Sequence, residues 1–83
     1  MADRTCQEIR KVIAQECGAR HITNSTKFMN NKDFSYFECV GALYTLQHKF
    51  DVKLPESDYD KYKTVGSLTR CIIKQIRNNA KQH

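Results

Sequence analysis

Residues 35–55, SYFECVGALYTLQHKFDVKLP, contain the pattern that decides the fold. Ser35 and Glu38 match the S-x-x-E capping box that opens α-helices. Apolar residues then recur at helical spacing as far as Phe50, and the proline at the end of the stretch prevents the helix from continuing. The stretch therefore predicts a helix over residues 36–50, followed by a non-helical connection.

Two further helices are expected on either side of this one. Thr5 and Glu8 form a second capping box, which predicts a helix over residues 6–17 that the following glycine terminates. Thr64 is a suitable N-cap for a last helix over residues 65–78, because a regular apolar stripe follows it. The polar C-terminal residues are expected to fray.

A short fourth helix is predicted over residues 58–62, with Ser57 as its cap. No strand pattern or internal repeat is present, so the predicted fold class is all-α, a small bundle of three main helices and one short helix. A single domain over residues 1–83, with an ordered part over about 5–78, fits a chain of this length. The expected core consists of Ile9, Ile13, Phe28, Leu43, Leu46, Phe50, Leu68 and Ile72.

The segment between the first two helices, residues 19–34, is a long loop with the sequence ARHITNSTKFMNNKDF. Loops of this length in compact domains are usually functional or held down by their own side chains. Four apolar side chains within it favour the second explanation: Ile22, Phe28, Met29 and Phe34.

The size and composition favour a carrier, adaptor or binding module over an enzyme. The chain has 83 residues, of which 40% are hydrophobic. We expect no catalytic residues, because His21, His48 and His83 lack a nucleophile or carboxylate at a catalytic spacing. The charged N-terminal stretch does not resemble a signal peptide, and no apolar run is long enough to span a membrane, so a cytoplasmic location is expected.

The four cysteines lie within helical apolar patterns and form no C-x-x-C motif. This placement favours free, buried thiols over a disulfide scaffold. Cys17 and His21 are spaced as two zinc ligands would be, but a structural zinc site needs four ligands. We therefore expect no metal.

The charge distribution points to a basic C-terminal segment. The formal net charge is +5, and no acidic residue follows Asp60. The basic last helix is expected to be a solvated face, or a surface for an acidic protein or an anionic lipid surface. A nucleic-acid-binding helical domain is a further alternative, but it lacks a helix-turn-helix signature. The basic residues are Lys61, Lys63, Arg70, Lys74, Arg77 and Lys81.

Three local matches make the chain resemble an acyl carrier protein over about residues 5–77. The stretch from His21 to Phe28 resembles the entry to the family's long loop. Residues 43–55 resemble the end of its second helix and the turn that follows. Residues 62–65, Tyr-Lys-Thr-Val, resemble the approach to its last helix.

The resemblance implies a carrier whose serine, in an Asp-Ser-Leu motif at the start of helix two, holds 4′-phosphopantetheine. A gapless count back from Phe50 places this motif on Ser35, Tyr36 and Phe37, so tyrosine stands at the usual attachment position. We expect no prosthetic group, with Ser35 acting as a helix cap. The alternative is a working carrier with 4′-phosphopantetheine on Ser35.

The resemblance also implies that partners dock on helix two, which in the family is acidic. Here residues 36–50 contain a single carboxylate, Glu38, so the expected partner-binding surface is aromatic and nearly neutral. Tyr36 is expected either to contact a protein partner or to fold back on Phe34. The function predicted is that of a non-catalytic binding or regulatory homologue in a lipid or polyketide-type pathway. Its expected partner-binding residues are Tyr36, Phe37, Val40 and Tyr44.

Overall fold

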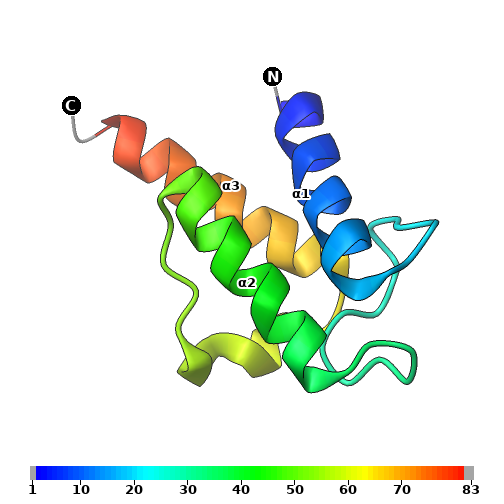
Figure 1. Cartoon of the computed structure of the whole chain (residues 1–83). Helices are drawn as coiled ribbons and strands as arrows, with labels where there is room; N and C mark the ends of the chain where they lie inside the picture. Colours follow the sequence, from blue (N-terminus) through cyan, green and yellow to red (C-terminus); the bar gives the residue numbers. More distant parts are fainter. Residues whose placement is uncertain (1, 82–83) are drawn as a thin grey trace.

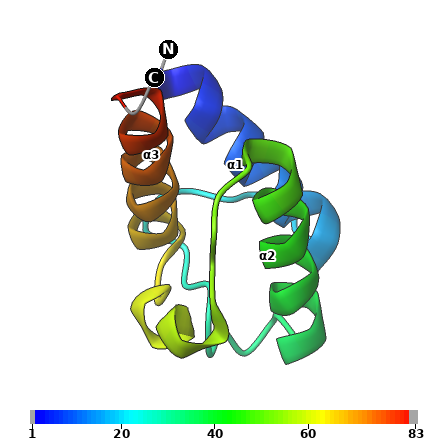
Figure 2. The same ribbon diagram turned by 90° about the vertical axis from the view of Figure 1, so that its left-hand side faces the viewer.

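The computed structural model describes residues 2–81, together with the side chains of residues 4–79. Its elements follow the order α1 (Ala2–Cys17), α2 (Tyr36–Phe50), the 3-10 helix η1 (Glu56–Lys61) and α3 (Val65–Lys81). Helices α2 and α3 run side by side in the same general direction, and α1 runs the opposite way (Figure 1, Figure 2). The predicted all-α class is confirmed.

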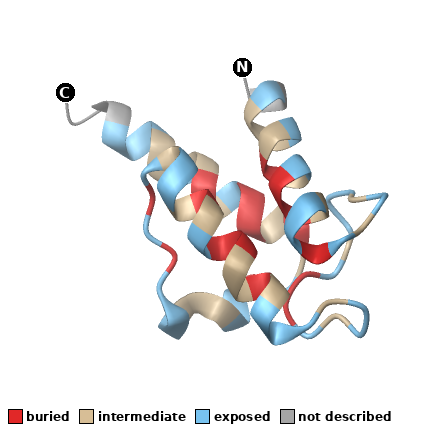
Figure 3. Cartoon of the chain, in the orientation of Figure 1, coloured by how far each residue is buried: buried red, intermediate tan, exposed pale blue. Residues whose placement is uncertain are grey.

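The core lies where the inner faces of α1, α2 and α3 meet (Figure 3). The expected core residues are buried with one exception, Phe50, which is half-buried and packs against the core. Its place in the last turn of α2 explains the difference, because a side chain at a helix end has neighbours on fewer sides. The fully buried residues predicted from sequence are Ile9, Ile13, Phe28, Leu43, Leu46, Leu68 and Ile72.

The first helix begins at Ala2, so the predicted start at residue 6 is wrong. Thr5 lies within the helix and therefore cannot be its N-cap. Residues 2–5 contain neither glycine nor proline, so nothing in them stops the helix from extending toward the N-terminus. The predicted end is confirmed, because α1 stops at Cys17 and Gly18 has the left-handed φ of 65°.

The short helix and the last helix also differ from prediction at their ends. The short helix is a 3-10 helix that starts after Pro55, whose φ of −69° suits a helix start, so Ser57 lies inside it. Helix α3 continues to Lys81 instead of fraying after residue 78, since no breaker follows Gly66. None of the helices within residues 2–81 has the length and apolarity needed to cross a membrane.

The long loop is held down by its own apolar side chains, as predicted. Phe28 and Met29 are buried, while Ile22 and Phe34 are partly buried and pack against the core. The loop is also paired through its backbone with the segment before α3. The Phe28 N–H donates to the Lys63 carbonyl at 2.8 Å. Within residues 2–81, the pairing amounts to one isolated antiparallel bridge between Lys27 and Thr64.

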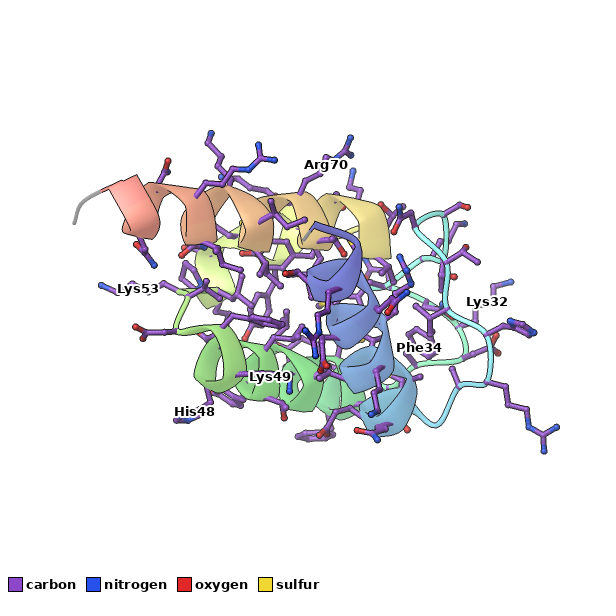
Figure 4. All side chains as sticks on the ribbon, turned by 90° about the horizontal axis from the view of Figure 1, so that it is seen from above. Lys32, Phe34, His48, Lys49, Lys53 and Arg70 are labelled. Carbon is purple, nitrogen blue, oxygen red and sulfur yellow. The ribbon has the colours of Figure 1, made fainter. Side chains whose placement is uncertain are left out.

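The connection from α2 to η1 is held by two glutamine side chains. Gln75 of α3 accepts from the Lys53 N–H at 2.9 Å and donates to the Lys53 carbonyl at 2.7 Å. Gln47 of α2 accepts from the Leu54 N–H at 2.9 Å. The Lys53 side chain itself points away from the bundle (Figure 4). The glutamines satisfy backbone groups that have no helical partner, and they fix η1 at the end of the bundle.

Replacing Leu46 by alanine tests this packing. Leu46 has no exposed surface, so Leu46→Ala should lower the free energy of unfolding by about 2–5 kcal/mol, measured by urea denaturation. The matched control is Phe37→Ala on the same helix, where 86% of the side chain is exposed and little stability should be lost. Equal effects of the two substitutions would contradict the assignment of the buried face of α2.

Candidate functional site

Ser35 caps α2 through both halves of a capping box. Its backbone is extended, with φ −70° and ψ 158°, and its Oγ accepts from the Glu38 N–H at 3.1 Å. The Glu38 carboxylate in turn accepts from the Ser35 N–H at 2.8 Å. The capping box predicted from sequence is confirmed. Ser35 is exposed, yet its hydroxyl oxygen already serves the backbone of the helix start.

Tyr36 is the first residue of α2, and its side chain lies on the surface. It is 54% exposed, and Phe37 beside it is 86% exposed. The Tyr36 ring lies 6.5 Å from the Phe37 ring, edge to face, and 6.4 Å from the ring of Tyr59 in η1. Phe34 packs against the core instead, so the ring neighbours of Tyr36 come from α2 and η1.

Tyr44 adds a third exposed aromatic side chain from α2, with 59% of its surface accessible. Its hydroxyl lies close enough to Tyr59 to affect that residue electrostatically. Partial burial raises the pKa of the Tyr59 hydroxyl, and Tyr44 and Tyr36 raise it further. Tyr59 is therefore a neutral hydrogen-bonding group at physiological pH. We call Tyr36, Phe37, Tyr44 and Tyr59 the aromatic surface.

The aromatic surface is anchored to the core through η1. The Tyr59 ring lies 6.2 Å from the ring of Tyr62, which is buried. Val40, the fourth residue predicted to bind a partner, is half-buried behind the exposed rings. Sequence reasoning missed Tyr59, because a helix of six residues shows no periodicity that would reveal which side it exposes. The flanking acids Asp58 and Asp60 were the available signal of a surface segment.

Little negative charge is available on α2. Its one carboxylate, Glu38, is engaged in the capping box, and Lys49 forms an ion pair with Glu8 of α1 at 3.2 Å. The hydrogen bond and the charge of Lys49 lower the pKa of the Glu8 carboxyl. His48 is exposed near the other end of the helix, pointing away from α1 and α3 (Figure 4). An aromatic, nearly neutral α2 is thus what a partner would meet.

The thiols are structural where they are buried. Cys17 and Cys39 lie in the core, and burial with the proximity of Cys39 raises the pKa of the Cys17 thiol to about 12. Cys39 donates from Sγ to the Phe28 carbonyl at 3.4 Å, and burial raises its pKa too. Neither thiol is poised as a nucleophile. Cys6 and Cys71 are only half-buried, which corrects the expectation for these two.

The residues considered as zinc ligands are not arranged as a site. Cys17 is buried at the end of α1, whereas His21 is exposed on the loop. Among the described side chains, no three histidines, cysteines or carboxylates come close enough together to hold a metal ion. The pairing of Cys17 with His21 in sequence therefore does not become a cluster in space.

Helix α3 presents its basic residues to solvent. Arg70, Lys74 and Arg77 are all exposed, at spacings of four and three residues that place them on one face. Arg70 projects from α3 on the side away from α2 (Figure 4). The basic face of α3 and the aromatic surface are therefore separate parts of the molecule.

This arrangement, three main helices with a capped α2 start beside a short helix, defines the class of small helical carrier-protein folds. Comparison with known proteins agrees with that class. A solution structure of the holo acyl carrier protein from Geobacter metallireducens matches 95% of this chain and 93% of its own, with a TM-score of 0.78 and 16% identity. At that identity the match establishes the fold alone.

Relatives by sequence point to the same family. Acyl carrier proteins of Borreliella burgdorferi, strains ZS7 and B31, are 25% identical over 75 residues, which cover 88% of this chain and 94% of theirs. The acyl carrier protein of Borrelia garinii subsp. bavariensis is similar to the same extent. No family model matches the chain. The sequence relatives and the fold together support a place for this chain in the acyl carrier protein family.

Replacing Ser35 tests the capping box. Ser35→Ala should lower the free energy of unfolding by about 1 kcal/mol in urea denaturation, because the Glu38 N–H loses its acceptor. Ser35→Asp should retain most of the stability, since aspartate caps as well as serine. Ser57→Ala is the matched control, on an exposed serine inside η1, and should be nearly neutral. A loss at position 57 equal to that at position 35 would contradict the cap.

Proposed function

We propose that this chain is a divergent acyl carrier protein homologue without a prosthetic arm. In this proposal it acts in the cytoplasm as a non-catalytic binding or regulatory subunit for a protein of a lipid or polyketide-type pathway. The observation that carries the proposal is the start of α2, where Tyr36 occupies the first helical position and Ser35 the cap. Acyl carrier proteins are carriers rather than catalysts, which accords with a subunit that performs no chemistry.

The chemistry of attachment favours an unmodified chain. A phosphopantetheine arm is esterified to a serine hydroxyl, and a phenol at the same position holds its oxygen several ångströms further from the backbone. The Ser35 oxygen accepts the Glu38 N–H at 3.1 Å, so a bulky ester on it would compete with the helix cap. The stretch ahead of the helix, Asn31-Lys32-Asp33, also differs from the family's Asp-Leu-Gly.

A working carrier modified at Ser35 is the second candidate. Ser35 is exposed and carries a primary hydroxyl next to the position where the family holds its arm. In this version the start of α2 would have to reorganise during modification, because the transferase needs the oxygen that the cap now uses. The two candidates differ in a mass measurement.

Aromatic contact replaces acidic docking in the proposed interaction. Tyr36, Phe37 and Tyr44 offer a large exposed contact area. Tyrosine and other aromatic side chains bring contact area at low entropic cost and are frequent among binding hot spots. Because α2 offers almost no free carboxylate, the partner is expected to be apolar at this contact rather than strongly basic. The interaction should then depend little on ionic strength.

Intact mass spectrometry tests the missing arm. After incubation with coenzyme A and a broad-specificity phosphopantetheinyl transferase, the wild-type chain should keep its mass. A double substitution, Ser35→Asp with Tyr36→Ser, rebuilds the Asp-Ser pair on the same helix start and should acquire one arm. A wild-type chain that gains one arm, and loses that gain in Ser35→Ala, would overturn the proposal in favour of the second candidate.

Substitution of Tyr36 tests the partner surface. A partner retained from a lysate of the source organism would be purified and titrated calorimetrically against the variants. Tyr36→Ala should weaken binding at least tenfold, as expected for an interface hot spot, and raising the salt should change the affinity little. The matched control, Tyr59→Phe, keeps the ring and should bind normally. Binding that disappears in moderate salt and depends on Arg70, Lys74 and Arg77 would assign the interface to α3 instead.

A further inference from the structure

A second hollow lies away from the aromatic surface, between α1, the long loop and the first turns of α3. We call it the α1–α3 groove. Its volume is about 410 Å³, and no carboxylate lines it. Helix α3 carries no acidic residue at all, so the surroundings of the groove on that side are purely basic. The lining residues are Cys6, Asn24, Ser25, Thr64, Gly66, Thr69, Arg70 and Ile73.

Two arginines lie at the groove. Arg70 lines it, is exposed, and has no ion-pair partner among the described side chains. Arg10 of α1 donates from its guanidinium to the Asn24 side-chain oxygen at 3.4 Å, which brings a second positive charge beside the groove wall. A guanidinium offers several N–H donors in a planar fork that matches the oxygens of phosphate or carboxylate groups.

Thr69 gives the groove an unsatisfied polar group. Its side chain is only 3% exposed, and its Oγ1 has no hydrogen-bond partner among the described residues. Leaving a buried hydroxyl unpaired is unfavourable, and native proteins rarely do so without a reason. Threonine in helices divides between two side-chain rotamers, so the hydroxyl has a second orientation available within α3. A ligand in the groove would supply the missing partner.

The wall of the groove is held firmly in place. The Gly66 N–H donates to the Asn24 carbonyl at 2.8 Å. A side chain at Gly66 would put its Cβ only 2.9 Å from that carbonyl oxygen, so glycine is what lets the loop approach α3 this closely. Ser67 and Thr64 cap the start of α3 with each other's hydroxyls. The groove is thus a fixed feature of the fold and not a gap between mobile loops.

We propose that the α1–α3 groove binds a phosphate group, held by Arg70 and by the Thr69 hydroxyl. Phosphate fits better than a carboxylate because it presents more oxygens to donors that approach from different elements. The phosphate can come from a soluble phosphorylated metabolite or from the headgroup of an anionic lipid. The inference does not depend on the proposed function, since the groove and the aromatic surface lie on separate elements.

Titration with inorganic phosphate, followed by ¹H–¹⁵N NMR at constant ionic strength, tests the groove. Phosphate should produce saturable shifts centred on residues 24, 25, 66, 69 and 70, and acetate at the same ionic strength should not. Arg70→Gln should weaken binding about tenfold, the effect of losing one charge-assisted hydrogen bond. Thr69→Val should also weaken it, while urea denaturation verifies that this variant remains folded.

The matched control is Arg77→Gln, which removes an exposed charge from the same face of α3 without touching the groove lining. It should leave phosphate binding unchanged. Equal weakening by Arg70→Gln and Arg77→Gln, or equal shifts with acetate, would show a diffuse basic face and overturn the proposal.

Vesicle binding distinguishes the two sources of phosphate. Phosphatidylcholine vesicles with and without phosphatidic acid would be sedimented with the wild-type chain and with the Thr69→Val variant. Retention that requires phosphatidic acid and falls in Thr69→Val identifies a lipid headgroup, whereas groove binding of free phosphate without retention identifies a soluble ligand. Retention that is insensitive to Thr69→Val, in a chain whose groove ignores free phosphate, would refute the groove.

Discussion

The backbone pairing between residues 24–29 of the long loop and residues 62–66 before α3 is the constraint on which the rest of the structure depends. The Val65 N–H donates to the Thr26 carbonyl at 2.9 Å, and the Met29 N–H donates to the Tyr62 carbonyl at 3.1 Å. These bonds satisfy buried backbone groups that lie outside the helices. They also carry Phe28 into the core, where its carbonyl accepts from the Cys39 thiol of α2.

Both candidate surfaces follow from this pairing. On one side it sets Asn24 against Gly66 and so forms the wall of the α1–α3 groove. On the other it fixes Tyr62 in the core, and Tyr62 supports the ring of Tyr59 beneath Tyr36. A loop that a chain of this size would otherwise leave mobile becomes a rigid connection between two binding regions. The order of the loop therefore has functional as well as structural consequences.

The sequence was sufficient for the helices and for most of the core, because amphipathic spacing reports directly which side of a helix is buried. It was sufficient for the start of α2 as well, since the Ser35–Glu38 box is a local interaction of four residues. It failed at the start of α1, where Thr5 and Glu8 have the spacing of a capping box but lie within the helix. A capping pattern shows that a cap is possible, and only the preceding residues decide whether the helix extends past it.

The candidate sites were predictable only where they depend on local sequence. Tyr36, Phe37 and Tyr44 could be assigned to a surface from the register of α2, but their contact with Tyr59 required the tertiary fold. The groove was beyond prediction, because an unpartnered Thr69 is invisible in a helical pattern that has room for a polar residue. Hydrogen bonds between distant segments carry no sequence signature of their own, as the Gln75 contacts with Lys53 also illustrate.

The distribution of charge gives the two surfaces different physical characters. The one carboxylate of α2 is consumed by the capping box, while three acidic residues gather in η1 at positions 56, 58 and 60. The cations of α3 face the other way, with no acid on their own helix to neutralise them. Association at the aromatic surface would be short-ranged and largely independent of salt, because it relies on burying rings. Association at the groove would be favoured at long range by the basic field around it. One small bundle can therefore hold an anion on one face and a protein on another, with little electrostatic interference between them.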